Sequence, residues 1–333
     1  MPKLRVGVIF GGRSGEHEVS LISAESVMKA LDRSKYEVIP IKIEPDGSWH
    51  GVSISVDPHE NSDLDVVFPV LHGTYGEDGT MQGFLELANL PYVGAGFAAS
   101  AVSMDKAFMR VLFAHAGLPL LPWDTFLHHE WKDNTQEITS RLEATLGYPM
   151  FVKPANLGSS VGISKVKSPA DLAPAVEHAF EYDRKIVVEQ GLIGAREVEC
   201  SVLGHNNPQA SVLGEIVPAH EFYDYNDKYH NEKSRLIIPA PLSEEQTKQV
   251  QDYAVRAFKA VDCSGMGRVD FFVDREGEIY VNEINTIPGF TQISMYPKLW
   301  EQSGLPYSAL LDRLIAIAVE KHRERQNLRT SLS

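Results

Sequence analysis

The chain has 333 residues, of which 43% are hydrophobic and 23% charged, and its formal net charge is −14. This length allows two or three domains, and the composition is that of an ordinary globular protein. The negative charge argues against binding to a nucleic-acid backbone, because such surfaces carry an excess of lysine and arginine.

Cysteine content and hydropathy narrow the setting further. Cys200 and Cys263 are too few for a disulfide framework or a zinc site, so we expect two small core residues in a reducing compartment. We find no signal peptide and no apolar run near the roughly 20 residues of a membrane helix. We therefore expect a cytoplasmic protein without a membrane partner.

The first hundred residues alternate strand and helix patterns. The apolar segments predict an open, mostly parallel sheet and a first domain over residues 1–100, with a loop or ragged edge over residues 44–63. The predicted strands cover residues 4–10, 36–43 and 64–70, and the predicted helices follow the first glycine-rich turn to about Leu31 and cover residues 81–89.

Two further blocks mix strands and helices. We expect domains over residues 101–190 and 191–333, and a frayed polar tail after about His322. Ser243 and Gln246 form a capping-box pattern, followed by an apolar stripe that predicts a helix. Other predicted helices cover residues 106–115 and 135–146, and predicted strands cover residues 150–153, 161–166, 197–203 and 210–217.

The turn after the first strand reads Gly11-Gly12-Arg13-Ser14-Gly15. A dinucleotide fingerprint needs glycine where Phe10 stands, and no Gly-Lys-Ser/Thr sequence completes a Walker loop. A dinucleotide-dependent dehydrogenase is therefore a weak alternative. Glu16, which follows the turn, suits either the start of a helix or a binding site.

A second glycine-rich segment runs from Phe151 to Gly162 and contains Lys153. A strand brings the lysine to a loop whose amides and hydroxyls could surround phosphates. A surface hairpin with an exposed lysine is the plainer interpretation of this segment alone.

The pattern that most specifically suggests a metal lies near the C-terminal end. Residues 267–273 and 279–285 predict a β-hairpin, and a two-residue turn at Glu276-Gly277 would place Asp270 opposite Glu283 and Arg268 opposite Asn285. Opposed carboxylates repel unless a cation lies between them, and oxygen ligands favour Mg²⁺. A bulge would spoil this register.

Two loops complete the candidate site. Residues 220–230 are aromatic and charged without periodicity, which suggests a lid over a substrate or a long solvated connector. His72 follows a strand in a glycine-rich turn, where a site role and a structural role are equally reasonable.

In this order, the motifs resemble those of the D-alanine–D-alanine ligase family of ATP-grasp enzymes, from Phe10 to about Ile315. The resemblance implies an N-terminal open sheet domain of α/β type, two α+β domains that clasp ATP, and commonly a homodimer. It implies ATP, Mg²⁺ or Mn²⁺ (two ions) and D-alanine as the small-molecule partners.

The resemblance also assigns individual roles. Glu16, Ser159 and Tyr229 form a hydrogen-bonded set that closes the lid, with Glu16 receiving the ammonium group of the first substrate beside His72. Arg268 and the Gly289 amide stabilise the oxyanion, and Ser294 with the Met295 amide holds the second carboxylate, although leucine is frequent at residue 295. The ATP contacts fall to Lys106, Lys153, Glu189, Leu192, Glu197 and Lys228, and the metal ligands are Asp270, Glu283 and Asn285.

These roles imply that one D-alanine carboxylate becomes an acyl phosphate and that the amine of a second D-alanine attacks it, which gives the dipeptide for peptidoglycan precursors. The Lys228-Tyr229 pair is the form that accompanies an amine acceptor. The alternatives are a D-lactate or D-serine ligase of the same fold, and a non-catalytic nucleotide-binding subunit.

Overall fold

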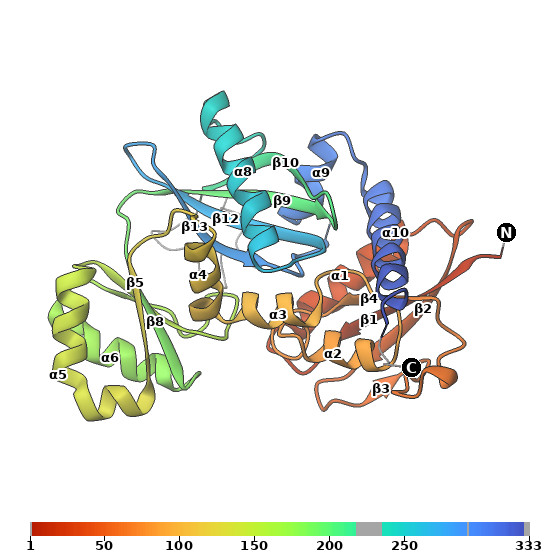
Figure 1. The fold of residues 1–333 in the computed structure, drawn as a ribbon, viewed down its shortest axis with the longest axis horizontal. Helices are drawn as coiled ribbons and strands as arrows, with labels where there is room; N and C mark the ends of the chain where they lie inside the picture. The colour runs from red at the N-terminus through yellow and green to blue at the C-terminus, as the bar shows by residue number, and fades with distance from the viewer. Residues whose placement is uncertain (1, 218–234, 292, 330–333) are drawn as a thin grey trace.

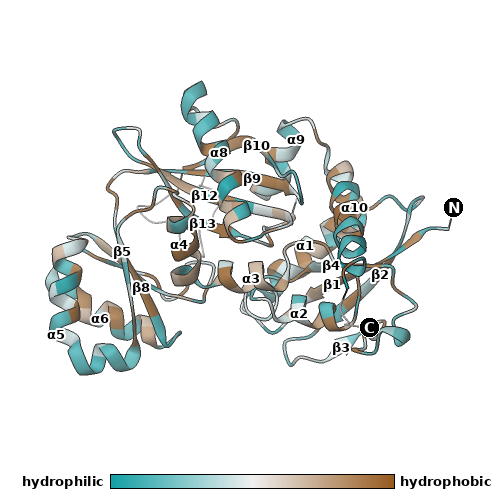
Figure 2. Cartoon of the chain, in the orientation of Figure 1, coloured by the Kyte–Doolittle hydropathy of each residue, from teal (hydrophilic) through white to brown (hydrophobic). Residues whose placement is uncertain are grey.

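The computed structural model describes residues 2–217, 235–291 and 293–329. These residues form three β-sheets with helices packed against them (Figure 1). Figure 2 shows hydrophobic residues gathered in the strands, whereas the outer helix α5 is mostly hydrophilic. No helix within the described ranges has both the length and the apolar character to cross a membrane.

The first sheet has the strand order β3-β2-β1-β4. Strand β1 pairs in parallel with β2 and β4, and the short β3 adds an antiparallel edge, which confirms the mostly parallel sheet and the ragged edge. Its elements are β1 (Leu4–Gly11), α1 (His17–Ala30), β2 (Tyr36–Ile43), β3 (Trp49–His50), η1 (Pro58–Glu60), β4 (Val66–Val70), α2 (Thr80–Leu87) and α3 (Phe97–Met104).

The second sheet is antiparallel, in the order β5-β8-β6-β7. Strand β7 begins later than the sequence predicted, because Gly162, inside the predicted strand, takes a positive φ of 70°. The elements are α4 (Lys106–His115), β5 (Trp123–Leu127), α5 (His128–Thr145), β6 (Met150–Pro154), β7 (Ser164–Val166), α6 (Pro169–Phe180) and β8 (Lys185–Gln190).

Helix α5 begins seven residues before its predicted start, and its non-helical residue Asn134 explains the difference. The amphipathic pattern restarts after this kink, so the sequence indicated only the second part of the helix.

The third sheet is antiparallel, in the order β11-β10-β9-β12-β13. The predicted capping box is present, since Ser243 Oγ accepts a 3.2 Å hydrogen bond from the Gln246 amide at the start of α8. The elements are β9 (Arg196–Gly204), β10 (Gln209–Val217), β11 (Arg235–Ile237), α8 (Glu244–Ala260), β12 (Gly265–Val273), β13 (Ile279–Asn285), α9 (Met295–Gln302) and α10 (Tyr307–Gln326).

Helix α10 packs back against the first sheet, and its residues share a hydrophobic core with β1, β4 and α1 (Figure 1). The prediction of a frayed tail after His322 is wrong as far as Gln326. Glu324 accepts hydrogen bonds of 3.0 and 2.9 Å from His205 and Asn206, and Arg325 pairs with Glu86. These polar contacts hold a segment that lacks an apolar face.

Both cysteines are buried and free, as predicted.

Candidate functional site

The β12–β13 hairpin has the predicted register at its functional end. Arg268 pairs with Asn285, and Asp270 pairs with Glu283. The predicted two-residue turn is wrong, because Val273 pairs with Ile279 across a longer loop. A bulge next to Asp270 shifts the pairing by one residue, so it restores the register that the longer loop would otherwise have changed.

Cations of the protein accompany these opposed carboxylates. Arg268 donates from Nε and Nη2 to the two oxygens of Asp270, both at 2.7 Å, and Lys106 Nζ lies 3.8 Å from Glu283 Oε2. Within the described ranges, no three acidic, histidine or cysteine side chains converge as a metal-binding group. The donor chemistry still fits Mg²⁺ or Mn²⁺, because Asp270, Glu283 and Asn285 offer oxygens on one sheet face.

Lys153 lies in a buried charged cluster at the end of β6. Its ammonium group contacts the carboxylate of Glu189 on β8, which also contacts Arg110 on α4. All three residues are buried, with at most 8% of the residue surface exposed. Burial and the nearby Arg110 charge lower the pKa of Lys153 to about 7. A lysine held in this way can gain a proton when an anion arrives.

Lys106 extends the cluster toward the phosphate loop. It is the first residue of α4, and its ammonium group donates to the Leu157 carbonyl at 2.6 Å. The base of the loop is fixed by Asn156, whose backbone and side-chain nitrogens donate to Asp183 at 2.8 and 2.9 Å. The two predicted phosphate lysines therefore approach the same loop from different elements.

Arg110 is a member of this cluster that the sequence analysis missed. It follows Lys106 by four residues on α4, so the two lie on one helix face. That spacing was the available signal. Burial lowers the pKa of Arg110 to about 10.

Glu16 links the first sheet to the phosphate loop. It precedes α1, and its Oε1 accepts a 2.6 Å hydrogen bond from Ser159 Oγ. The turn before it requires glycine, since a Cβ at Gly11 would lie 2.2 Å from the Ile43 carbonyl oxygen. Tyr229 and Lys228, with the predicted lid over residues 220–230, lie outside the described residues.

His72 is buried beside the same turn. Its Nδ1 lies 3.4 Å from Glu77 Oε1 and its Nε2 lies 3.2 Å from Ser23 Oγ. Burial acts to lower the pKa of His72, but the hydrogen bond to Glu77 and the charges of Glu77 and Glu16 raise it above the ordinary value. The ring also lines a cavity of about 250 Å³. Glu77, which sequence reasoning did not single out, is thus the partner of His72.

Ser294 directly precedes α9, and its side chain closes the turn after the hairpin. Its Oγ accepts from the Thr291 amide at 3.0 Å, and a Cβ at Gly289 would lie 2.9 Å from that oxygen. The Met295 side chain is buried against Gly214, where a Cβ would lie 2.5 Å from its sulfur. The Met295 side chain therefore packs against β10, so a contact between residue 295 and a substrate would be made by the backbone.

Leu192 lies in the connection from β8 to β9, and Glu197 lies at the start of β9. Leu192 is half-buried in the loop, and Glu197 lies on β9 opposite Phe272. The Glu197 charge acts on Lys153 by raising its pKa, against the larger effects of burial and Arg110. The structure thus links Glu197 to the cluster around Lys153 through its charge.

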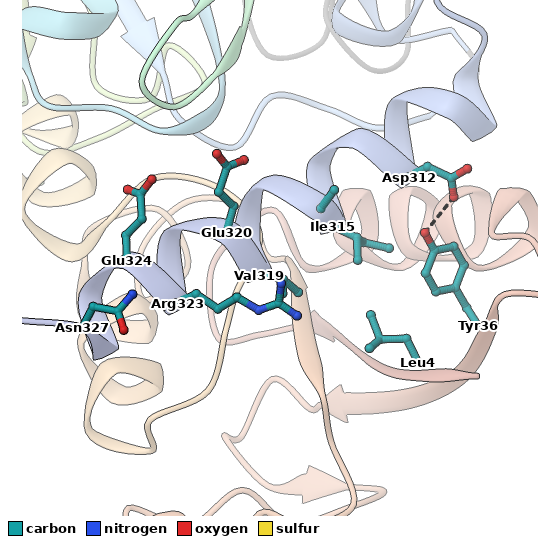
Figure 3. A pocket seen from close by; sticks show the side chains of 10 residues that line it. Leu4, Tyr36, Asp312, Ile315, Val319, Glu320, Arg323, Glu324 and Asn327 are labelled. Atoms are coloured by element: carbon teal, nitrogen blue, oxygen red, sulfur yellow. Dashed lines mark hydrogen bonds between the residues drawn. The ribbon is translucent and has the colours of Figure 1, made fainter. Parts of the chain in front are cut away.

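A separate hollow of about 480 Å³ lies where α10 meets β1 and β2 (Figure 3). Tyr36 donates a 2.8 Å hydrogen bond to Asp312 at one end of it, and Arg323 and Glu324 lie toward the other. None of the predicted site residues that the structure describes lines this hollow.

An open, mostly parallel sheet, followed by two antiparallel sheets with lysines and carboxylates between them, defines the ATP-grasp class of enzymes. The family models "D-ala D-ala ligase N-terminus" and "D-ala D-ala ligase C-terminus" match residues 5–59 with 50–95, and residues 112–316. The chain belongs to the D-alanine–D-alanine ligase family.

Individual relatives agree over the whole chain. A D-alanine–D-alanine ligase of Natranaerobius thermophilus is 50% identical and is covered completely, as is this chain. The D-alanine–D-alanine ligase structure from Coxiella burnetii is 40% identical, with a TM-score of 0.88 over 97% of this chain and 96% of that one. The VanG D-Ala:D-Ser ligase of Enterococcus faecalis is 38% identical, with a TM-score of 0.87 over 95% of this chain and 100% of that one. These likenesses exclude the dehydrogenase alternative.

Proposed function

We propose that this chain is an ATP-dependent D-alanine–D-alanine ligase that supplies the dipeptide for peptidoglycan precursors. Its membership of the ligase family supports the activity. The observation that carries the chemistry is the meeting of Lys106 and Lys153 with the Arg268–Asp270–Glu283 face of the third sheet.

Lys106 and Lys153 would hold the ATP phosphates, with Lys228 beside the transferred group. Leu192 would lie by the adenine and Glu197 by the ribose hydroxyls. The Glu189 carboxylate is already engaged by Arg110 and Lys153, so we assign the contact of Glu189 with adenine to its backbone.

Asp270, Glu283 and Asn285 would hold two Mg²⁺ or Mn²⁺ ions. When bound, these ions supply positive charge to the phosphates of ATP. The carboxylates that the hairpin opposes offer the hard oxygen ligands that such ions require.

Glu16 would orient the ammonium group of the first D-alanine, with His72 beside it. The carboxylate of this D-alanine attacks the γ-phosphorus atom of ATP, which forms the acyl phosphate and releases ADP. The loop held by the Glu16–Ser159 hydrogen bond, with Tyr229, would exclude water from this intermediate.

The second D-alanine would be held through its carboxylate by Ser294 and the Met295 amide. Its amine attacks the acyl carbon atom, and phosphate leaves with one former carboxylate oxygen. Arg268 and the Gly289 amide would stabilise the oxyanion that forms at this step.

A D-serine or D-lactate ligase is the second candidate, because the VanG D-Ala:D-Ser ligase matches the fold almost as well. Lys228 and Tyr229 favour D-alanine, because ligases that use D-lactate or D-serine carry other residues at these positions. We also propose the domain division 1–100, 101–190 and 191–333, a homodimer and a cytoplasmic location.

Phosphate release from ATP and Mg²⁺ tests the proposal directly. We expect release that depends on D-alanine and yields D-alanyl-D-alanine, with L-alanine inactive. Competition of D-alanine with D-serine and with D-lactate, measured across pH, separates the three acceptors. Release without D-alanine dependence would remove the substrate assignment, and no release with any of these acids would support a non-catalytic nucleotide-binding protein.

A further inference from the structure

A buried carboxylate that the sequence analysis did not assign, Glu199, lies next to the hairpin. It belongs to β9 and is 6% exposed. Asp270 on β12 pairs with Glu199 on one side and with Glu283 of β13 on the other. Three carboxylates therefore form one row across adjacent strands, where neighbouring chains are about 5 Å apart.

Arg268 lies between two members of this row. Its Nε and Nη2 donate to both oxygens of Asp270 at 2.7 Å, and Nε lies 3.1 Å from Glu199 Oε2. The Arg268 and Asp270 side chains are 17% and 16% exposed, whereas the Glu199 side chain is 8% exposed. Glu199 is thus the inner partner of a guanidinium group that two carboxylates share.

Asp270 has two cationic partners in this proposal, the Arg268 guanidinium group and a divalent metal ion. Its two oxygens face Arg268, and the same oxygens are the proposed ligands of a divalent cation. A cation there would compete with the guanidinium group for them, because both are positive. Arg268 would then lose its main orienting contact at the stage when an oxyanion needs it.

We propose that Glu199 is a positioning residue that keeps Arg268 in place when Asp270 turns to the divalent cation. This inference rests on the proposed function. Glu283 also acts on Arg268 from β13, while Lys106 and Lys153 face the carboxylates from α4 and β6. Glu199 differs from these groups because it touches the Nε atom that Asp270 would release.

The test compares Glu199→Gln with Glu215→Gln. Glu215 is also a buried carboxylate paired with an arginine, Arg196 at 2.7 Å, and it lies on the adjacent strand β10. Register places Gly214, not Glu215, opposite Glu199, so Glu215 points to the other sheet face. We expect Glu199→Gln to lower kcat about tenfold, less than the hundredfold or greater loss from removing an oxyanion donor, and to change KM for ATP less than about threefold. Glu215→Gln should leave both near wild type.

A spectroscopic measurement separates positioning from folding. The Nε–H resonance of Arg268, assigned by its absence in Arg268→Lys, should be protected in the wild type with and without Mg²⁺ and ADP. In Glu199→Gln it should be protected without Mg²⁺ and ADP and lost when both are added. Protection that persists in Glu199→Gln with Mg²⁺ and ADP would overturn the inference. If Glu199→Gln unfolds, Glu199→Asp keeps the charge and should retain the signal, and its loss there would also overturn the inference.

Failure of the proposed function would look different. Binding of Mn²⁺ in the presence of ADP, followed by electron paramagnetic resonance, should be lost in Asp270→Asn. Binding retained in Asp270→Asn would contradict the metal assignment whatever Glu199→Gln does. Loss in Asp270→Asn, with a persistent Arg268 signal in Glu199→Gln, would keep the proposed function and reject the role of Glu199.

Discussion

Lys153 illustrates how burial prepares a single side chain for an anionic ligand. The ammonium group is removed from water and lies near Arg110, so its charged form is disfavoured despite Glu189. Phosphate groups would reverse this balance by adding negative charge. The lysine therefore becomes most useful when the ligand is present.

We expect ATP binding at pH 8 to be coupled to proton uptake, because the pKa of Lys153 is about 7 before the ligand arrives and rises when phosphates approach. Apparent ATP affinity should weaken as pH rises through 7. Calorimetry in buffers of different ionisation enthalpy measures this uptake. Lys153→Ala should abolish the proton uptake and lower the ATP affinity about tenfold or more. The exposed Lys132→Ala should change neither the uptake nor the affinity. Unchanged binding in Lys153→Ala would contradict the phosphate role.

Arg268 should act mainly on turnover. Its fixed guanidinium group suits charge that develops during the reaction more than charge already present on ATP. We expect Arg268→Ala to lower kcat by about a hundredfold or more and to change ATP affinity only severalfold, as measured by steady-state kinetics and nucleotide titration. Equal losses in both quantities would argue against the oxyanion role.

The sequence predicted the pairing of the β12–β13 hairpin at its functional end but not its loop or its bulge. Alternation of polar and apolar residues predicted that Asp270 and Glu283 share a face, and the structure confirms their pairing. The loop length and the bulge were both missed, since neither leaves a periodic signal. Two of the missed residues, Arg110 and Glu199, meet their partners through packing between elements that are distant in sequence. Glu77 lies only five residues after His72 and was missed because the turn between them has no periodic pattern.

The Glu16–Ser159 hydrogen bond links the phosphate loop to the turn that follows β1. We expect Ser159→Ala to loosen the loop, so that water reaches the acyl phosphate and more than one phosphate is released per dipeptide. Parallel assays of phosphate and dipeptide give this ratio. The exposed Ser34→Ala, in the turn after α1, should stay near one. A ratio of one in Ser159→Ala would show that the Glu16–Ser159 contact does not protect the intermediate.

At the scale of the whole molecule, the two ends of the chain are joined. Lys321 on α10 donates to the Gly94 carbonyl at 3.0 Å and lies 4.2 Å from the centroid of the Tyr92 ring. The sequence predicted a mostly parallel sheet followed by two blocks of mixed strands and helices, but it could not predict that α10 returns to the first sheet. That packing depends on a core built from residues hundreds of positions apart.

We expect Lys321→Ala to reduce the free energy of unfolding by about 2 kcal/mol, from the lost charged hydrogen bond to the Gly94 carbonyl and the lost packing of the side-chain stem. Thermal and denaturant unfolding measure the change, and the exposed Lys248→Ala serves as control. A stability equal to that of the wild type would mean that the Lys321 contacts do not hold α10 to the first sheet.

In the proposed reaction, the first D-alanine is activated as an acyl phosphate. Transfer of ¹⁸O from the D-alanine carboxylate to inorganic phosphate, followed by mass spectrometry, tests it most directly. We predict one ¹⁸O atom in each phosphate released with dipeptide, because the leaving phosphate carries a former carboxylate oxygen. Unlabelled phosphate accompanying labelled dipeptide would contradict the mechanism.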